Sequence, residues 1–154
     1  MNAIDSPQSQ RLILEDVGFT INGQVLLSAI DLELAGHGCT VILGPNGAGK
    51  SLLLRICHGL LAPTSGSVRW NGASPSKALL RRQAMVFQRP VLLRRSALSN
   101  IAYPLKLAGV GREERRFRAT EALKRFGLAE VASRPARVLS GGEQQRLALA
   151  RAWV

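Results

Sequence analysis

The sequence is poor in aromatic, cysteine, histidine and acidic residues. Of its 154 residues, 5% are aromatic, 2 are cysteine, 2 are histidine and 10 are acidic. Cys39 and Cys57 lack both the paired spacing of a zinc site and the density of a disulfide scaffold, so we expect two buried, reduced thiols. His37 and His58 are equally isolated, which favours packing or surface roles over metal binding or catalysis.

Long apolar runs are also missing. No stretch reaches the roughly 18 to 20 consecutive apolar residues that span a bilayer, and residues 1–10 lack the basic and apolar regions of a secretion signal. The sequence therefore predicts a cytoplasmic chain that meets a membrane only through a partner. With 46% hydrophobic residues, the chain is long enough for one domain with its own core.

The scarcity of acidic residues leaves a formal net charge of +11. Such an excess is compatible with nucleic acid, acidic lipid or anionic small molecules as partners. Much of it lies between Lys77 and Arg137, where few aromatic side chains are present to stack on bases. A solvated or partner-facing surface is therefore the alternative, and we do not expect nucleic acid to be a partner.

Short strands are predicted in the first part of the chain. The runs "RLILEDVGFTI" (11–21) and "AIDLELA" (29–35) surround the turn-like "NGQ" and predict paired strands. "CTVIL" (39–43) predicts a strand buried on both faces, and a helix with apolar residues at helical spacing follows from Lys50 and ends at "GLLAPTSG". "SVRWNG" (67–72) and "AMVFQ" (84–88) predict two further strands.

Helical periods replace the strands from Arg94 onward. "REERRFRATEALKRFGL" (112–128) predicts an amphipathic helix with Phe117, Ala122, Leu123 and Phe126 toward one side. A last helix is predicted to begin at Ser140. We expect a flexible tail at 1–10, a core that contains the strands at 11–93, a helical subdomain at 94–137, and a final segment and helix at 138–154.

The segment "GPNGAGKS" (44–51) matches the phosphate-binding pattern G-x-x-x-x-G-K-[ST]. A turn that points backbone N–H groups inward at a helix start binds phosphate, and glycines leave room for both turn and ligand. Lys50 would reach the β- and γ-phosphates and Ser51 would bind Mg²⁺. The alternative is a glycine-rich structural turn. The candidate nucleotide-binding residues here are Gly44, Pro45, Asn46, Gly47, Ala48, Gly49, Lys50 and Ser51, which makes 11–93 the predicted nucleotide-binding core.

Two further segments carry a family resemblance. "LSGGEQQRLALARA" (139–152) resembles the signature segment of ATP-binding cassette (ABC) ATPases, and "MVFQ" resembles the family's strand that ends in a glutamine, here Gln88. The resemblance extends from about Arg11 to the last residue. It implies an α/β fold of the P-loop NTPase type, with N-terminal β-strands, a partial parallel sheet and an inserted helical subdomain.

The resemblance also implies roles for these residues. Ser140, Gly141, Gly142 and Glu143 would contact ATP held by a second cassette in a head-to-tail dimer. A hydroxyl and free N–H groups at a helix start suit an anion, although an ordinary capped helix start is the alternative. Gln88 would approach Mg²⁺ and the attacking water. Gln88 and Ser51 would both help to bind the Mg²⁺. The alternative is that Gln88 is only a polar residue that ends a strand.

The sequence departs from the family pattern at two places. The family stacks an aromatic side chain on adenine at the end of the first strand, where this chain has Ile21, with Phe19 two residues earlier. The family also continues after the signature helix with a strand ending in Asp-Glu, whereas this chain ends at Val154. We therefore assign no catalytic base, and expect a truncated fragment that binds ATP weakly without hydrolysing it.

The resemblance predicts the ATP-binding subunit of an ABC transporter, placed at the inner face of the cell membrane by permease subunits. "PVLLRRSALSNIAYPLKLAG" (90–109) is similar to segments of cassettes that import small solutes, including tungstate- or phosphate-type oxyanions and methionine. A solute-binding protein is then a further partner. A soluble ABC ATPase acting on nucleic acid or the ribosome is the alternative function, although residues 50–139 contain no sustained heptads.

Overall fold

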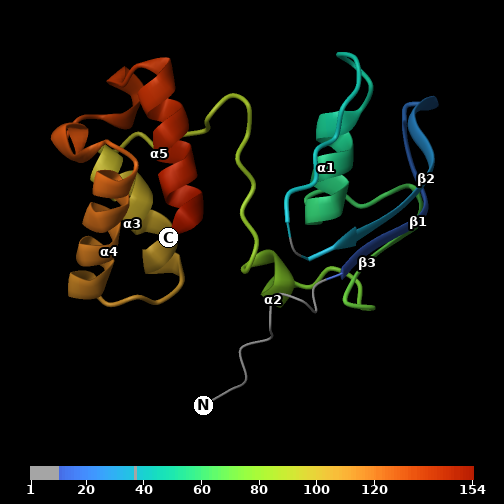
Figure 1. Cartoon of the computed structure of the whole chain (residues 1–154), viewed down its shortest axis with the longest axis horizontal. Coiled ribbons are helices and arrows are strands. Elements are labelled where there is room, and N and C mark those ends of the chain that lie inside the picture. Colours follow the sequence, from blue (N-terminus) through green and yellow to red (C-terminus); the bar gives the residue numbers. More distant parts are fainter. Residues whose placement is uncertain (1–10, 37) are drawn as a thin grey trace. The chain divides into compact units, whose positions relative to one another are not determined.

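The computed structural model describes residues 11–36 and 38–154, which form two units, one ending at Gln83 and the other beginning at Ala84 (Figure 1). We call them unit 1 and unit 2 and describe each by itself. The predictions for the tail at 1–10 and for His37 lie outside the described residues. None of the helices in the described part of the chain is long and apolar enough to cross a membrane.

Unit 1 contains a three-stranded antiparallel sheet in the order β2-β1-β3. Its strands are β1 (Arg11–Ile21), β2 (Gln24–Ala35) and β3 (Ser65–Trp70). Asn22 and Gly23 connect β1 to β2 with φ angles of 50° and 76°, as a tight hairpin turn requires. The predicted hairpin around "NGQ" is therefore confirmed.

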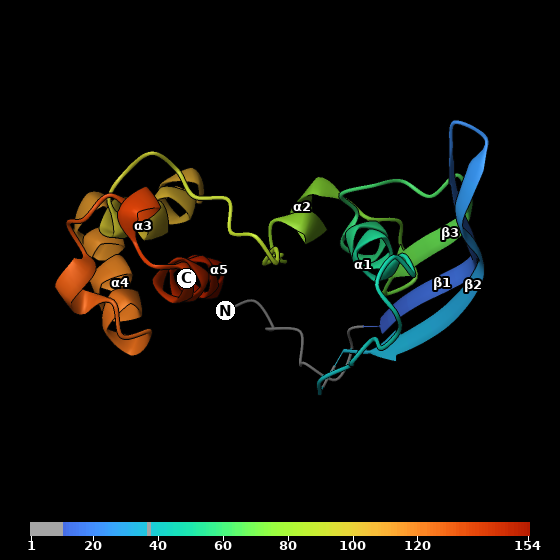
Figure 2. The same cartoon turned by 90° about the horizontal axis from the view of Figure 1, so that it is seen from above.

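Helix α1 (Lys50–His58) covers one face of this sheet, as Figure 2 shows. The buried side chains between helix and sheet come from all of these elements: Leu12, Leu14, Val17, Leu27, Ile56, Cys57 and Val68. The indole N–H of Trp70 donates a hydrogen bond to the Cys57 carbonyl at 2.9 Å, which joins the end of α1 to β3. The short helix α2 (Lys77–Leu80) follows later in unit 1.

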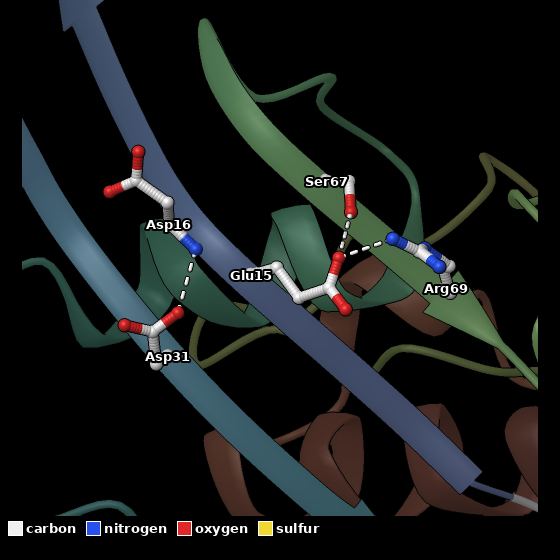
Figure 3. Close-up of polar contacts among 5 residues, drawn as sticks. All are labelled: Glu15, Asp16, Asp31, Ser67 and Arg69. Carbon is white, nitrogen blue, oxygen red and sulfur yellow. Dashed lines mark hydrogen bonds and ion pairs between the residues drawn. The ribbon is translucent and has the colours of Figure 1, made fainter.

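A bulge in β1 keeps its later side chains on the core side of the sheet. Asp16 has a φ of 47°, and its backbone N–H donates to the Asp31 carboxylate at 2.8 Å (Figure 3). The adjacent Glu15 accepts a hydrogen bond from the Ser67 hydroxyl at 3.1 Å and pairs with Arg69. The pairing register shifts here, so both Leu14 and Val17 are buried although they are three residues apart.

Two strand predictions were wrong. Residues 39–43 and 84–88 are neither helix nor strand, and Val41 and Leu43 are 69% and 86% exposed. A strand inside a parallel sheet gains its hydrogen bonds and burial from strands on both sides. Because no strand pairs with either segment in the described residues, their apolar pattern does not produce a strand. Cys39 is consequently exposed rather than buried, whereas Cys57 is buried as predicted.

Unit 2 contains the helices that the sequence predicts from Arg94 onward. Its main helices are α3 (Ala97–Leu107), α4 (Arg112–Arg125) and α5 (Gly141–Trp153), and two short 3₁₀ turns, η2 (Ala129–Val131) and η3 (Ala136–Val138), precede α5. The helices share one apolar core, whose largest fully buried side chains are Ile101, Leu123, Leu128 and Leu147. Buried Asn100 ties α3 to the preceding segment, accepting from the Leu93 N–H at 2.8 Å and donating to the Ser96 carbonyl at 3.0 Å.

The predicted core face of α4 needs one correction. Ala122 and Leu123 are buried and Phe126 packs against the core, but Phe117 is 63% exposed. Phe117 precedes Ala122 by five residues, which turns its side chain by about 140° around the helix. Ala119 occupies the core position instead.

Candidate functional site

The phosphate-loop motif lies in unit 1 and leads into the first turn of α1. Gly44, Gly47 and Gly49 all have positive φ angles, of 155°, 86° and 82°, and Gly49 is the residue that caps α1. The Leu53 N–H donates to the Gly49 carbonyl at 2.8 Å, which is the first bond of the helix. The earlier N–H groups of an α-helix have no partner within the helix and are available to an anion.

Gly49 also lies against the sheet. A Cβ at this position would lie 2.7 Å from Cδ2 of Leu27 and 3.4 Å from the Leu26 carbonyl oxygen, both in β2. The Leu27 side chain would therefore have to shift to accept a larger residue, and the left-handed backbone at Gly49 favours glycine independently. The sequence pattern predicted the glycine but gave no signal for Leu27 as its neighbour, because the two are far apart along the chain.

Lys50 folds back over the loop that precedes it. Its ammonium donates hydrogen bonds to the carbonyl oxygens of Gly44 at 2.8 Å and Pro45 at 2.7 Å. The positive charge is thus held at the mouth of the loop by two neutral acceptors. Phosphate oxygens are stronger acceptors for an ammonium, so the side chain can exchange these carbonyls for an anion.

The residues around the loop fit a nucleotide phosphate with magnesium. Glycines with positive φ, the start of α1 and the Lys50 ammonium together provide N–H donors and positive charge. The Ser51 side chain is exposed in the first turn of α1. No cluster of three or more His, Cys, Asp or Glu residues suitable for a metal occurs in the described part of the chain. A magnesium ion here would take the Ser51 hydroxyl together with phosphate oxygens and water.

The position where the family has an aromatic residue for adenine is occupied by Ile21, at the end of β1. Ile21 is 50% exposed at the hairpin turn, directly opposite Gln24. Phe19 packs against the core of unit 1. Phe19 is only partly buried there, and Ile21 is the more exposed of the two residues.

Gln88 lies in unit 2, in an exposed segment without regular structure. The prediction that it ends a strand was wrong, for the reason given above. Its approach to magnesium and water stays a prediction, because the phosphate loop belongs to unit 1 and each unit is described separately.

The signature residues begin α5 in unit 2, and Ser140 caps the helix as predicted. The Ser140 N–H and hydroxyl both donate to the Glu143 carboxylate, at 2.7 and 2.6 Å, and the Glu143 N–H donates to the Ser140 hydroxyl oxygen at 3.4 Å. This is a reciprocal capping box. Gly141 and Gly142 form the exposed first turn.

Glu143 is the residue whose local role the sequence reasoning missed. The two hydrogen bonds from Ser140 hold the pKa of its carboxyl below the ordinary glutamate value, and the positive charges of Arg134 and Arg146 act in the same direction. The pattern S-x-x-E before an apolar run is the signal that could have found this pairing. The start of α5 therefore carries a negative charge of its own.

The chain is similar to known proteins over most of its length. The sequence model of the ABC transporter family matches residues 27–154. The chain belongs to this family. The tungstate uptake system ATP-binding protein TupC of Peptoclostridium acidaminophilum is 43% identical over 130 residues, which cover 84% of this chain and 60% of that protein. The Fe(3+) ions import ATP-binding protein FbpC of Pasteurella multocida is 37% identical over 146 residues, covering 93% of this chain and 42% of that protein.

A solved structure supports the same family fold. The structure of cbiO1 from Clostridium perfringens, part of the ABC transporter complex cbiONQ, matches with a TM-score of 0.77 and 29% identity, over 92% of this chain and 60% of that one. The fold is thus that of an ABC ATPase domain, which confirms the predicted P-loop NTPase class. This chain spans 60% of the length of the tungstate protein and less than half of the iron protein.

Proposed function

We propose that the chain is the ATP-binding part of an ABC importer subunit that couples ATP binding and hydrolysis to transport. The observation that carries the proposal is the loop at 44–51, where left-handed glycines, a helix start and the Lys50 ammonium form a phosphate cradle. The similarity to proteins named for tungstate, iron, methionine and taurine uptake supports the importer role.

In this proposal the cradle binds the phosphates of ATP and Ser51 contributes its hydroxyl to Mg²⁺, which neutralises phosphate charge during phosphoryl transfer. Lys50 leaves the carbonyls of Gly44 and Pro45 for the β- and γ-phosphates. Gln88 approaches Mg²⁺ and water. Ser140, Gly141 and Gly142 bind the γ-phosphate of ATP held by a second copy, with Glu143 holding the cap.

The proposed partners are a second cassette, permease subunits that place the chain at the inner face of the membrane, and a solute-binding protein. For the solute we propose a small oxyanion of the tungstate type, on the resemblance of residues 90–109 to such cassettes; a tungstate uptake protein and a taurine import protein are both 43% identical to this chain. The comparisons give no support for the alternative of a soluble ATPase acting on nucleic acid. Most of the excess positive charge lies in unit 2 and suits a protein or membrane-facing surface equally well.

Calorimetric titration with MgATP tests the cradle. The unmodified chain should bind ATP, and Lys50→Ala should weaken binding by at least about tenfold, because a charge-assisted contact to phosphate is lost. Lys77→Ala is the matched control, since Lys77 is an exposed lysine of unit 1 outside the loop, and should leave affinity unchanged. Equal loss in both variants would contradict the cradle. A phosphate-release assay on the same samples tests the expectation that the 154 residues do not turn ATP over.

A further inference from the structure

Asn100 lies on α3, and its side chain is fully buried although it is polar. Its carbonyl oxygen Oδ1 accepts a hydrogen bond from the Leu93 N–H at 2.8 Å. Its amide nitrogen Nδ2 donates to the backbone carbonyls of Leu93 at 3.2 Å, Arg95 at 3.3 Å and Ser96 at 3.0 Å. These contacts use both donors of the amide as well as its acceptor. Asn100 therefore fixes the backbone from Leu93 to Ser96.

The same backbone is joined to the chain that leads into α5. The Ala136 N–H donates to the Arg95 carbonyl at 2.9 Å, so this one oxygen accepts from both Ala136 and Asn100. Ala136 begins the turn η3, which ends shortly before Ser140, the cap of α5. We call residues 93–96 together with Ala136 the junction. The junction connects the segment after Gln88 with the segment before Ser140.

Gln88 precedes the junction in a segment that lies along an apolar groove of unit 2. The groove is lined by residues of α3 and α5 and, from the segment itself, by side chains that include Val86 and Leu93. Residues 84–93 are neither helix nor strand, so no regular backbone ladder fixes them. Their position therefore depends on side-chain packing in the groove and on the contacts of Asn100 at the end of the segment.

We propose that Asn100 is a positioning residue for both proposed ATP contacts of unit 2: through the junction it holds Gln88 on one side and the start of α5 at Ser140 on the other. The inference rests on the proposed function, in which Gln88 approaches Mg²⁺ and Ser140 contacts the ATP of a second copy. It adds a residue that is buried and acts through others. A buried amide whose hydrogen bonds are all satisfied tolerates little movement, so the two segments keep one mutual arrangement.

The competing interpretation is that Asn100 only stabilises unit 2, as a satisfied buried polar group does. The two interpretations differ in what is lost with the amide. A residue that only stabilises the fold lowers stability and nothing else. A positioning residue also removes the effect of Gln88 on Mg²⁺-bound ATP, which a double-mutant comparison detects.

Calorimetric titrations of the full 154-residue chain with ATP, in Mg²⁺ and in EDTA, test the proposal. Gln88→Ala should weaken MgATP binding about two- to tenfold, because one polar contact is lost, and should leave ATP binding in EDTA unchanged. Asn100→Ala should show the same Mg²⁺-dependent loss. The variant that carries both substitutions should lose no more affinity than either single variant, because Asn100 acts through Gln88.

Ile101→Ala is the matched control. Ile101 is the next residue of α3 and is also fully buried, but it packs in the apolar core of unit 2. Its variant should lower the urea midpoint and leave the affinity for MgATP unchanged. Asn100→Ser and Ile101→Val form a milder pair for use if either alanine variant does not fold. The serine hydroxyl has a single donor, so Asn100→Ser should still weaken MgATP binding.

Amide hydrogen exchange measures the α5 side of the junction. In Asn100→Ala the amides of Ala136 and Ser140 should exchange at least about tenfold faster relative to the Leu123 amide in the core of α4. In Ile101→Ala the exchange rates of these amides should rise together. Unchanged relative protection of Ala136 and Ser140 in Asn100→Ala would overturn the inference.

The titrations separate failure of this inference from failure of the proposed function. Three results would overturn the inference: additive losses from Gln88→Ala and Asn100→Ala, equal losses from Asn100→Ala and Ile101→Ala, or no effect of Gln88→Ala. In each case, binding that Lys50→Ala abolishes would leave the phosphate site standing. Absence of any Lys50-dependent binding would remove the proposed function, and this inference with it.

Discussion

The starts of α1 and α5 are both candidate anion sites, but they are capped in different ways. Gly49 caps α1 with a left-handed backbone, and no side-chain cap is found there among the described residues. Ser140 caps α5 through its hydroxyl, and Glu143 completes the box with a carboxylate. The start of α1 is therefore free to bind an external anion, whereas the start of α5 already has the Glu143 carboxylate.

A helix start can serve to bind an anion or to stabilise the helix, and the two caps differ in which of these they favour. A cap made by glycine leaves backbone N–H groups and positive charge uncompensated, which suits tight phosphate binding but contributes little stability. A Ser-Glu box satisfies two backbone N–H groups, here those of Ser140 and Glu143, and stabilises the helix. An anion that binds at Ser140 therefore has to share or displace the Glu143 contact, and we expect that site to be the weaker of the two for free phosphate.

The largest effect on this comparison should come from Gly49→Ala. A non-glycine residue in the left-handed region costs roughly 1–2 kcal/mol, and the new Cβ would also lie 2.7 Å from Leu27, which is buried. We expect the free energy of unfolding to fall by about 2–3 kcal/mol in a urea titration.

Gly47→Ala separates the two causes. Gly47 has a φ of 86°, close to that of Gly49, but no atom lies within 4 Å of the site of its Cβ. Its variant should lose only the backbone part, about 1–2 kcal/mol. Equal losses at the two positions would show that the contact between loop and strand has no role in requiring glycine at 49.

The next largest effect should come from the same substitution at both helix starts. Ser140→Ala removes the capping hydroxyl and should destabilise the chain by about 1 kcal/mol. Ser51→Ala should change the free energy of unfolding by less than about 0.5 kcal/mol, because Ser51 is exposed and caps nothing. It should instead weaken ATP binding in the presence of Mg²⁺.

Thermal unfolding and ATP titration of both variants, with and without Mg²⁺, check that Ser140→Ala lowers stability and Ser51→Ala lowers ATP affinity. A Ser51 variant that loses stability and keeps its affinity for ATP contradicts this expectation.

The features that the sequence predicted correctly depend on a few neighbouring residues. Asn22-Gly23 specifies a hairpin turn, Gly59 with φ of 81° ends α1, and Ser140 begins α5, each through local backbone or capping geometry. The glycine-rich turn at 44–49 belongs to the same class, since its glycines and the helix that follows are encoded together; its binding of phosphate stays a prediction. These elements could be predicted without any knowledge of distant contacts.

The wrong predictions depend on distant partners or on exact helical phase. Val41 and Leu43 have a strand pattern but no neighbouring strand in the described residues, so the pattern alone does not form one. Phe117 is apolar but lies on the wrong side of α4. The contact between Gly49 and Leu27 has no local signature, whereas the pairing of Ser140 with Glu143 has one that went unused.

The smallest expected effect is the pH dependence of the α5 cap. The carboxyl pKa of Glu143 is lowered in the folded chain by its hydrogen bonds from Ser140, below the ordinary value of 4.5. A group whose folded pKa is depressed stabilises the fold above the unfolded pKa, and this contribution is lost as the pH falls through the folded pKa. Glu143→Gln keeps the shape but cannot ionise. The unmodified chain should therefore be more stable than this variant at pH 7, and the difference between their urea midpoints should shrink as the pH falls from about 5 toward 3. A difference that stays constant across this range would mean that the carboxylate charge does not stabilise the cap.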